Sequence, residues 1–373
     1  MTDLTRRGVL RAGTAGVAAL AVPSGQAFAQ ATQPKRGGTV VVATDAAPPS
    51  LDGQITSAQE ARNINLHMYE TLYARDENAS PVPDLAQGVQ IAKDGLTYTF
   101  TLRPGVRFHN GKTMASGDVV ASLERYRKVG ASPALLGAVD RIEASGSLEV
   151  TIRLKRGQSS FIDSISSPRA PIAIYPAEEA VKPLKDFRYI GTGPFKFVEY
   201  APDSHVTLDR FDGYTANPNY KKRDGFAGYK QVYVDRGIWR FMPESGARLA
   251  ALQTGEATIV ETVNGSQAKQ LAGKPQYKVL KVLPFLLQVF KFNHAVAPCG
   301  DVNFRRAVTA CLNMEETMAI AYPDINELDG SWVFPNSPYH TKAGLNLYNQ
   351  NDPAKAKALL AKSSYKGEKL TFI

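Results

Sequence analysis

The sequence predicts an α/β protein with at least two hydrophobic cores. Its 373 residues are 43% hydrophobic and 21% charged, which is an ordinary globular composition. Residues 96–103 alternate apolar and polar side chains, the period-2 pattern of a strand with one buried face. Residues 116–130 instead repeat their apolar side chains at helical spacing. Strands and helices are therefore expected in the same domain.

The stretch from Asp94 to Tyr126 predicts a strand, a hairpin and a helix in succession. Asn110-Gly111 is the dipeptide that most readily supplies the two positive φ values of a tight hairpin turn. Ser116 is the predicted N-cap of the helix, and Gly130 marks its end. The apolar residues of this helix form one stripe, so we expect it to pack against the hairpin: Val119, Val120, Leu123 and Tyr126.

The other elements follow from the same two periodicities. Asn313 and Asp352 are expected to cap helices, and Pro353 to begin one. Gly191-Thr192-Gly193-Pro194 lets a strand begin only at Phe195. Further strands are expected at 40–43, 142–144, 148–154, 172–175, 195–198, 206–208, 232–241, 259–260, 286–293 and 368–373. Further helices are expected at 60–75, 161–165, 244–254, 304–311, 314–321 and 353–360.

Residues 1–29 predict an export signal. Arg6-Arg7 precedes a small-residue apolar run at 12–22 and then Ala27-Phe28-Ala29, an A-x-A cleavage site. This order is typical of a twin-arginine signal peptide, and a disordered basic tail is the alternative. The apolar run is about half the ~20 residues of a spanning helix, so no permanent membrane anchor is expected. We predict a soluble periplasmic protein beginning near Gln30.

The basic charge balance does not predict a nucleic-acid partner. Removal of residues 1–29 takes away three Arg and one Asp, which lowers the net charge from +9 to +7. The longest basic run, Lys221-Lys222-Arg223, lies in a loop rich in Asn, Pro and Gly. No aromatic series of the kind that stacks on bases accompanies this run. A solvated loop is therefore the expectation.

The two cysteines, Cys299 and Cys311, are too few for a disulfide framework and lack metal-ligand spacing. Cys311 shares a helical face with Phe304 and Ala307, which favours a buried free thiol. A disulfide between the two cysteines is the alternative in an oxidising compartment.

No motif in the sequence predicts an enzyme. The five histidines lack the spacing of metal ligands and are expected to be surface or hydrogen-bonded residues. The sequence holds no nucleophile elbow, phosphate-binding loop or dinucleotide fingerprint. We therefore expect no catalytic residue, no metal and no cofactor.

Several stretches resemble one protein family, the family 5 (peptide/nickel type) periplasmic solute-binding proteins of ABC importers. The resemblance is densest in DGLTYTFTLRPGVRFHNGKTMASGDVVASLERY, at residues 94–126. GTGPFKF, RLAALQTGE, DVNFRRAV and YNQNDPAKAKALLAKSSYKG are also similar to family text. Lys221 stands where the family usually has Trp.

The resemblance implies a fold of the periplasmic binding protein type II kind, with two α/β lobes. It implies a first lobe whose main subdomain combines residues 30–55 and 185–270, with residues 56–184 inserted as a second subdomain. Residues 271–373 are then the second lobe, which is incomplete because the chain looks truncated beside the family. A carboxylate that receives a peptide's amino terminus in the family lies beyond residue 373.

The function that the resemblance implies is capture of a small solute in a cleft between the lobes. Delivery to a membrane permease would follow, and we expect a monomer. Peptides are the leading ligand class, and metal chelates, opines and sugars are also taken by family members. Two alternatives stay open: a secreted hydrolase with catalytic residues beyond residue 373, and a non-functional truncated binding protein.

Candidate ligand-binding residues lie in loops at strand ends, where a cleft is expected. Trp332 is the leading candidate, because an indole in a loop is costly unless it packs or binds. Arg169, between Pro168 and Pro171, is suited to pair with a ligand carboxylate. The alternatives are a packing role for Trp332 and a solvated or ion-paired surface role for Arg169. The full candidate set is Leu51, Tyr69, Arg169, Phe290, Asn293 and Trp332.

Overall fold

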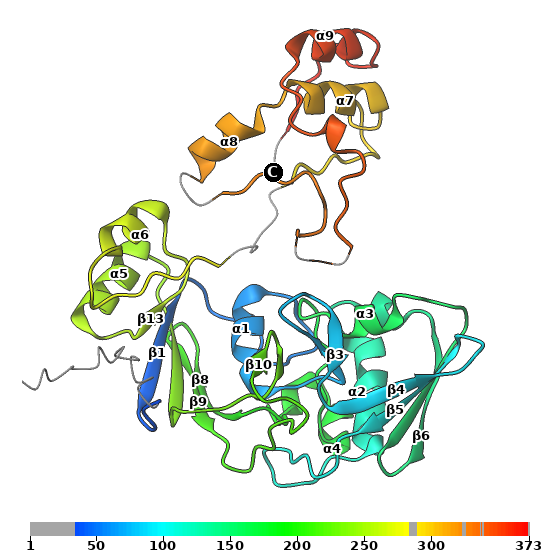
Figure 1. The fold of residues 1–373 in the computed structure, drawn as a ribbon, viewed down its shortest axis with the longest axis vertical. Helices are drawn as coiled ribbons and strands as arrows, with labels where there is room; N and C mark the ends of the chain where they lie inside the picture. Colours follow the sequence, from blue (N-terminus) through cyan, green and yellow to red (C-terminus); the bar gives the residue numbers. More distant parts are fainter. Residues whose placement is uncertain (1–33, 283–288, 323–325, 336, 338, 372–373) are drawn as a thin grey trace, which may run out of the picture. The chain divides into compact units, whose positions relative to one another are not determined.

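The computed structural model describes residues 34–371, except 283–288, 323–325, 336 and 338. The predicted signal peptide at 1–29 lies outside the described residues. The described chain contains a five-stranded sheet, a four-stranded sheet and a group of helices toward the C-terminus (Figure 1). Among these residues, no helix is both long enough and apolar enough to cross a bilayer.

The five-stranded sheet joins segments that are far apart in the sequence. β1 is parallel to β12 on one side and to β13 on the other, and β12, β9 and β8 then pair antiparallel. The turn at 191–194 leads directly into β8, as predicted. In sheet order the strands are β13 (Ile259–Val260), β1 (Thr39–Thr44), β12 (Arg236–Phe241), β9 (His205–Arg210) and β8 (Phe195–Ala201).

Helices pack on both faces of this sheet. Successive strand residues point to opposite faces. Val42 accordingly packs in a core with Ile64 of α1, whereas Ala43 packs with Ala251 of α5. α5 ends at Thr254, as predicted, and Gly255 follows it with φ +81°, the left-handed conformation that commonly ends a helix. These helices are α1 (Gln59–Met68) and α5 (Ser245–Thr254), and α6 (Gly265–Leu271) follows β13.

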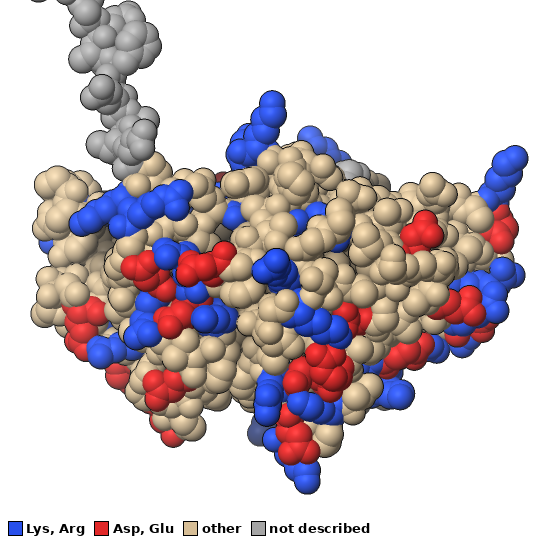
Figure 2. All heavy atoms as spheres, turned by 90° about the horizontal axis from the view of Figure 1, so that it is seen from below, with Lys and Arg blue, Asp and Glu red and all other residues tan. Residues whose placement is uncertain are grey.

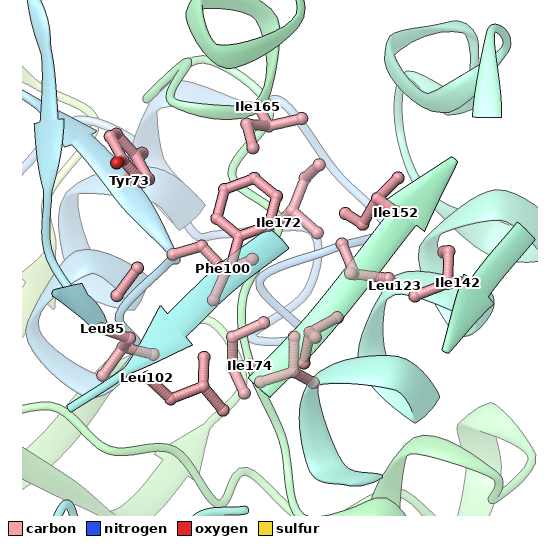
Figure 3. Close-up of a cluster of buried hydrophobic side chains, with 14 of the residues drawn as sticks. Tyr73, Leu85, Phe100, Leu102, Leu123, Ile142, Ile152, Ile165, Ile172 and Ile174 are labelled. Atoms are coloured by element: carbon pink, nitrogen blue, oxygen red, sulfur yellow. The ribbon is translucent and has the colours of Figure 1, made fainter. Parts of the chain in front are cut away.

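A four-stranded antiparallel sheet forms a second core. Tyr98, Phe100 and Leu102 of β5 are buried and alternate with partly exposed threonines, as predicted. Leu123 of α2 belongs to the same core, so this helix packs on the sheet (Figure 3). The sheet order is β4 (Ala86–Ile91), β5 (Thr97–Leu102), β7 (Glu149–Leu154) and β6 (Val139–Gly146). The helices here are α2 (Ser116–Val129), α3 (Phe161–Ile165) and α4 (Ala177–Ala180).

A turn forms at Asn110-Gly111, but only Gly111 has a positive φ, so the predicted turn with two positive φ values is wrong, and the cap of α2 differs as well. Gly111 has φ +86°, and its N–H donates to the Phe108 carbonyl at 2.8 Å. Ser116 is the first residue of α2 and Ala115 is the N-cap, so the predicted capping role of Ser116 is wrong. The carboxylate of Asp118 provides the polar contact instead, accepting from the Ala115 N–H at 2.9 Å.

The helix predicted at 60–75 ends at Met68, because another segment crosses its end. The Gly193 N–H donates to the Met68 carbonyl at 2.8 Å. A Cβ atom would lie 2.1 Å from that carbonyl oxygen on Gly191 and 2.7 Å from it on Gly193, so only glycine fits. The chain then continues in extended conformation at Tyr69. A short hairpin follows, of β2 (Tyr73–Arg75) and β3 (Pro81–Pro83).

Other predicted strands are absent from the described structure. Residues 172–175 are buried, but their N–H groups bond to the Glu70 carbonyl and to Ser122 Oγ rather than to a strand. β12 begins only at Arg236, so 232–235 precede it. Residues 289–293 and 368–371 are not strands either. The remaining residues of those two predictions, 286–288 and 372–373, lie outside the described residues.

Helices make up the regular structure from residue 289 onward, in the part that is described. The Ser364 N–H donates to Asp301 Oδ2 at 2.7 Å, and the rings of Phe304 and Tyr365 are 5.4 Å apart. Asn313 and Asp352 cap their helices through side-chain oxygens, as predicted. The helices are α7 (Val302–Cys311), α8 (Met314–Ala321) and α9 (Pro353–Ala361).

Both cysteines are free, so the alternative of a disulfide does not hold in this structure. Cys311 is exposed, and the prediction of a buried thiol is wrong for it. The buried face of α7 is formed by Phe304, Ala307 and Ala310, which leaves the last residue of the helix facing solvent.

A buried ion pair joins the loop after β1 to α2. The Asp52 carboxylate accepts from the Arg125 guanidinium and from the Tyr175 hydroxyl, the latter at 2.8 Å. Arg125 also donates to Gln54 Oε1 at 3.0 Å. The Asp52 and Arg125 side chains are only 3% and 4% exposed. Buried charges are tolerated when they are paired and fully hydrogen-bonded, so this network fixes the two segments together.

His109 connects the 106–113 hairpin to the turn at 191–193. Its Nδ1 accepts from the Gly191 N–H at 3.1 Å, and its Nε2 lies 3.0 Å from the Gly193 carbonyl. These partners require the neutral tautomer with the proton on Nε2. Burial lowers the pKa of His109 to about 4. The imidazole thus positions a turn by hydrogen bonding, in line with the hydrogen-bonded role expected for the histidines.

Charges of both signs are mixed on the surface. Arg236 of β12 pairs with Asp209 of β9, and Arg210 pairs with Asp235, each at 2.6 Å. Figure 2 shows Lys and Arg side chains among Asp and Glu side chains on one face of the molecule. Exposed pairs of this kind contribute little to stability.

Asp52→Asn is expected to lower the free energy of unfolding by about 3–5 kcal/mol. The substitution keeps the shape of the side chain but leaves Arg125 as an uncompensated buried charge. Denaturant unfolding measures the change. Glu124→Gln is the matched control on α2, because Glu124 pairs with Arg127 at the surface. The control is expected to cost below about 0.5 kcal/mol, and equal losses for both variants would contradict the role of the network.

Stability is expected to fall as the pH drops from about 6.5 to about 4, through His109. The unfolded chain binds this proton near pH 6.5, whereas the folded chain resists it until about pH 4. The loss is on the order of 3 kcal/mol at the acid end, and none is expected above pH 7.

His109→Asn isolates this contribution, since asparagine retains an acceptor near the Nδ1 position and does not titrate. The difference in unfolding free energy between the wild type and this variant is measured across the pH range. A difference that does not change with pH would show that the His109 proton is not linked to folding.

Candidate functional site

A groove of about 1090 Å³ lies beside α1 in the first part of the chain. Its walls come from β1 and β12, from residues 166–171 and from residues 221–234. Residues 221–234 include a small hairpin of β10 (Arg223–Asp224) and β11 (Ala227–Gly228). Segments distant in the sequence therefore share one concave surface of the size that binds small ligands.

Aromatic rings form one region of the groove. The His67 ring lies 5.1 Å from the Trp239 ring and 5.9 Å from the Phe195 ring, both edge to face. Trp239 is 5% exposed and lies against Gly237, where a Cβ atom would be 2.8 Å from the indole. His67 Nδ1 is 2.8 Å from the Asn63 carbonyl, and burial lowers the pKa of His67. This region presents flat apolar surface and a neutral imidazole.

A cluster of charged side chains forms a second region. Lys230 Nζ donates to Glu70 Oε1 at 3.1 Å and to both Asp84 oxygens at 3.2 Å. The Tyr214 hydroxyl donates to Glu70 Oε1 at 2.9 Å, and Arg103 lies 3.9 Å from Glu70 Oε2. The two carboxylates and two cations balance, so the cluster is a neutral structural unit rather than a charged pocket.

The protonation of this cluster follows from its burial. Burial raises the pKa of Asp84 to about 6, although the Lys230 charge opposes the shift. Burial alone would lower the pKa of Lys230, but the neighbouring carboxylates outweigh it and raise that pKa. Within the described residues, Glu70 Oε2 and two nitrogens of Arg103 have no hydrogen-bond partner.

An acidic residue lies at another part of the groove. Glu261 follows β13 and accepts from the Asn63 side chain of α1 at 3.2 Å. Burial raises the pKa of Glu261, against the stabilising hydrogen bond from Asn63. A carboxylate at the carboxyl ends of parallel strands is well placed to meet a polar ligand group.

Three of the sequence candidates, Leu51, Tyr69 and Arg169, lie in the same part of the chain as this groove. Tyr69 borders it, and its buried hydroxyl donates to the Leu51 carbonyl at 3.0 Å. Leu51 is fully buried in the core, so its side chain does not reach the groove surface. Arg169 is exposed between Pro168 and Pro171, which both border the groove. Burial and the charge of Arg169 lower the pKa of Arg62.

The other three candidates lie on the chain after residue 288. Phe290 is half-exposed, and Trp332 is 71% exposed. Asn293 is exposed, and its Oδ1 accepts from the Ala295 N–H at 3.1 Å. Three residues before Trp332 in the sequence, Asp329 Oδ2 lies 2.9 Å from His340 Nε2.

Sequence reasoning missed His67, Trp239 and Lys230 as groove residues. Each one belongs to a segment whose local pattern indicates packing, and the groove is formed only by contacts between segments. Gly237, two residues before Trp239 in β12, is the one local signal, because a glycine inside a strand indicates close approach of another group. In the part of the chain that is described, no group of three His, Cys, Asp or Glu side chains could hold a metal ion.

Comparison with known proteins assigns this fold to a family. Residues 80–373 match the family model described as "Bacterial extracellular solute-binding proteins, family 5 Middle". A probable peptide ABC transporter periplasmic-binding protein of Sinorhizobium fredii is 28% identical over 99% of this chain. A glutathione-binding protein of Pectobacterium atrosepticum is 27% identical over 87% of it. The chain spans 70% and 61% of the length of these two relatives.

Solved structures agree on the fold. NikA from Brucella suis, in complex with Fe(III)-EDTA, has a TM-score of 0.73 at 22% identity, covering 87% of this chain and 64% of NikA. At this low identity the similarity shows a shared fold alone. That shared fold confirms the predicted binding-protein fold. Because the family model covers most of the sequence, the chain belongs to family 5 of the bacterial extracellular solute-binding proteins.

Proposed function

We propose that this protein is the solute-capturing component of an ABC importer, with a short peptide as the leading ligand class. The observation that carries the proposal is the family match over residues 80–373. Two relatives that match most of this chain have names that refer to peptide and to glutathione, which is itself a tripeptide. The bound solute would then be released to a membrane permease.

The chemistry of the groove supports binding rather than turnover. Lys230 donates to both Glu70 and Asp84, so the three side chains form a buried structural cluster. His67 is neutral and lies between aromatic rings. Aromatic surface with a few oriented polar groups is what a ligand-binding cleft requires.

The ligand contacts that we propose extend the sequence candidates. Arg169 would pair with a ligand carboxylate, and the rings of Trp332 and Phe290 would cover apolar parts of the ligand. Tyr69 and Leu51 would support the cleft from below, because the two residues are buried and hydrogen-bonded to each other. Asn293 would hold the chain at the crossing between lobes through its local backbone contact.

The proposed location is the periplasm, because the Sinorhizobium relative is named as a periplasmic-binding protein. Export by the twin-arginine pathway is proposed from Arg6-Arg7 and the cleavage site at 27–29. Replacement of both arginines by lysine is the direct check. Accumulation of unprocessed protein in the cytoplasm is the expected outcome, and unchanged export would exclude this pathway.

Protein recovered from its own periplasm is expected to carry a small solute that native mass spectrometry detects. Release of that solute on denaturation identifies its class. Recovery of unmodified solute supports capture. Turnover of ester, peptide or glycoside substrates by the same preparation would contradict the proposal.

Ligand capture is expected to shift the fluorescence of Trp332 to shorter wavelength. The chain has two tryptophans, of which Trp239 is 5% and Trp332 is 71% exposed. Trp239→Phe therefore leaves one exposed reporter, titrated with dipeptides and glutathione. Ligand-dependent thermal stabilisation without any change in Trp332 emission would exclude Trp332 from the site.

Arg169→Gln is expected to weaken binding of a peptide with a free carboxyl terminus at least about tenfold, because a charge-assisted hydrogen bond is lost. The same peptide as its carboxamide should bind both proteins equally. Arg153→Gln is the matched control, since Arg153 is an exposed arginine on β7. Equal losses in both variants would assign the effect to net charge.

A further inference from the structure

The β10–β11 hairpin contains or adjoins the longest basic run of the sequence. Backbone pairing and contacts with the loop after β2 hold it in place. β10 and β11 pair antiparallel around a two-residue turn. Gly225 has φ +58° at the first central position, as a type II′ turn requires. A Cβ atom there would lie 2.4 Å from the Asp76 carbonyl carbon, so the turn packs directly against the loop after β2. The Phe226 N–H also donates to the Arg75 carbonyl at 2.8 Å.

This hairpin exposes aromatic rings beside the basic run. Phe226 is 46% exposed and Tyr229 is 38% exposed. Lys221, Lys222 and Arg223 are exposed as well. The Tyr229 N–H donates to the Lys222 carbonyl at 2.8 Å, so these two residues lie opposite each other across the hairpin. The run is exposed to solvent, as the sequence predicts, but its end forms a short hairpin rather than an irregular loop.

The positive charge of the hairpin is only partly neutralised. Arg223 has Glu77 at 3.7 Å, in an exposed pair. Neither Lys221 nor Lys222 forms an ion pair with any described residue. These positive charges favour an anionic partner by charge complementarity.

A lipid surface fits this combination better than a protein partner does. Aromatic rings favour the boundary between headgroups and acyl chains, and cations favour anionic headgroups. A hairpin of two short strands offers far less than the about 1,200 Å² that a stable protein interface buries. A membrane contact needs only a few side chains, because weak contacts suffice for transient surface binding.

We propose that the β10–β11 hairpin is a contact surface for an anionic bilayer. Lys221, Lys222 and Arg223 bind lipid phosphate groups, and the Phe226 ring enters the headgroup layer.

Co-sedimentation with lipid vesicles tests the proposal, using the protein as recovered from the periplasm. Binding is expected to vesicles of phosphatidylglycerol and phosphatidylcholine, and not to phosphatidylcholine alone. The triple variant Lys221→Gln, Lys222→Gln, Arg223→Gln should bind about a hundredfold more weakly, at roughly fivefold per charge. Phe226→Ser should weaken binding at unchanged charge.

The matched control removes three exposed cations elsewhere: Lys93→Gln, Lys155→Gln, Arg156→Gln. This variant should retain most of the vesicle binding, which would locate the contact at the hairpin. An equal loss in the control would overturn the proposal in favour of net charge. Two results together would overturn the proposal in favour of a general anion contact. One is that Phe226→Ser binds vesicles as tightly as the wild type does, and the other is that the wild type binds soluble polyphosphate or single-stranded DNA as tightly as it binds vesicles.

Discussion

The buried pair of Asp52 and Arg125 is the interaction on which the first part of the chain depends. It connects the loop after β1 to α2, and so connects the five-stranded sheet to the helix that covers the four-stranded sheet. Burial of one unpaired charge costs several kcal/mol, so neither segment can move away alone. The Phe187 ring adds a cation–π contact to Arg125 at 4.7 Å. The network thus favours one arrangement of two otherwise separate cores.

Local patterns predicted much of the fold, and contacts between distant segments account for the failures. Residues 97–102 form a strand because their alternation matches a sheet with one buried face. The helix predicted to continue to residue 75 ends at Met68 because residues 191–193 cross there. Residues 172–175 look like a strand but bond to α2 and to residue 70 instead. No local window contains the partner that decides these cases.

The groove was harder to predict than the family. Family membership follows from short motifs that lie within one segment each, and so can be read directly from the sequence. Lys230 acquires its role only through carboxylates 160 and 146 residues away, at Glu70 and Asp84. Nothing around Lys230 in the sequence distinguishes it from a surface lysine. Residue type and loop position directed attention to Tyr69, which borders the groove, and to Arg169 beside it, but also to Leu51, which the core encloses.

The crossing of Gly191 and Gly193 over the end of α1 also limits how the groove can move. A contact of backbone on backbone has no side chain whose rotation could absorb a displacement. α1 and the start of β8 must therefore shift together as one rigid body. Widening of the groove on the α1 side therefore requires the start of β8 to move with the helix.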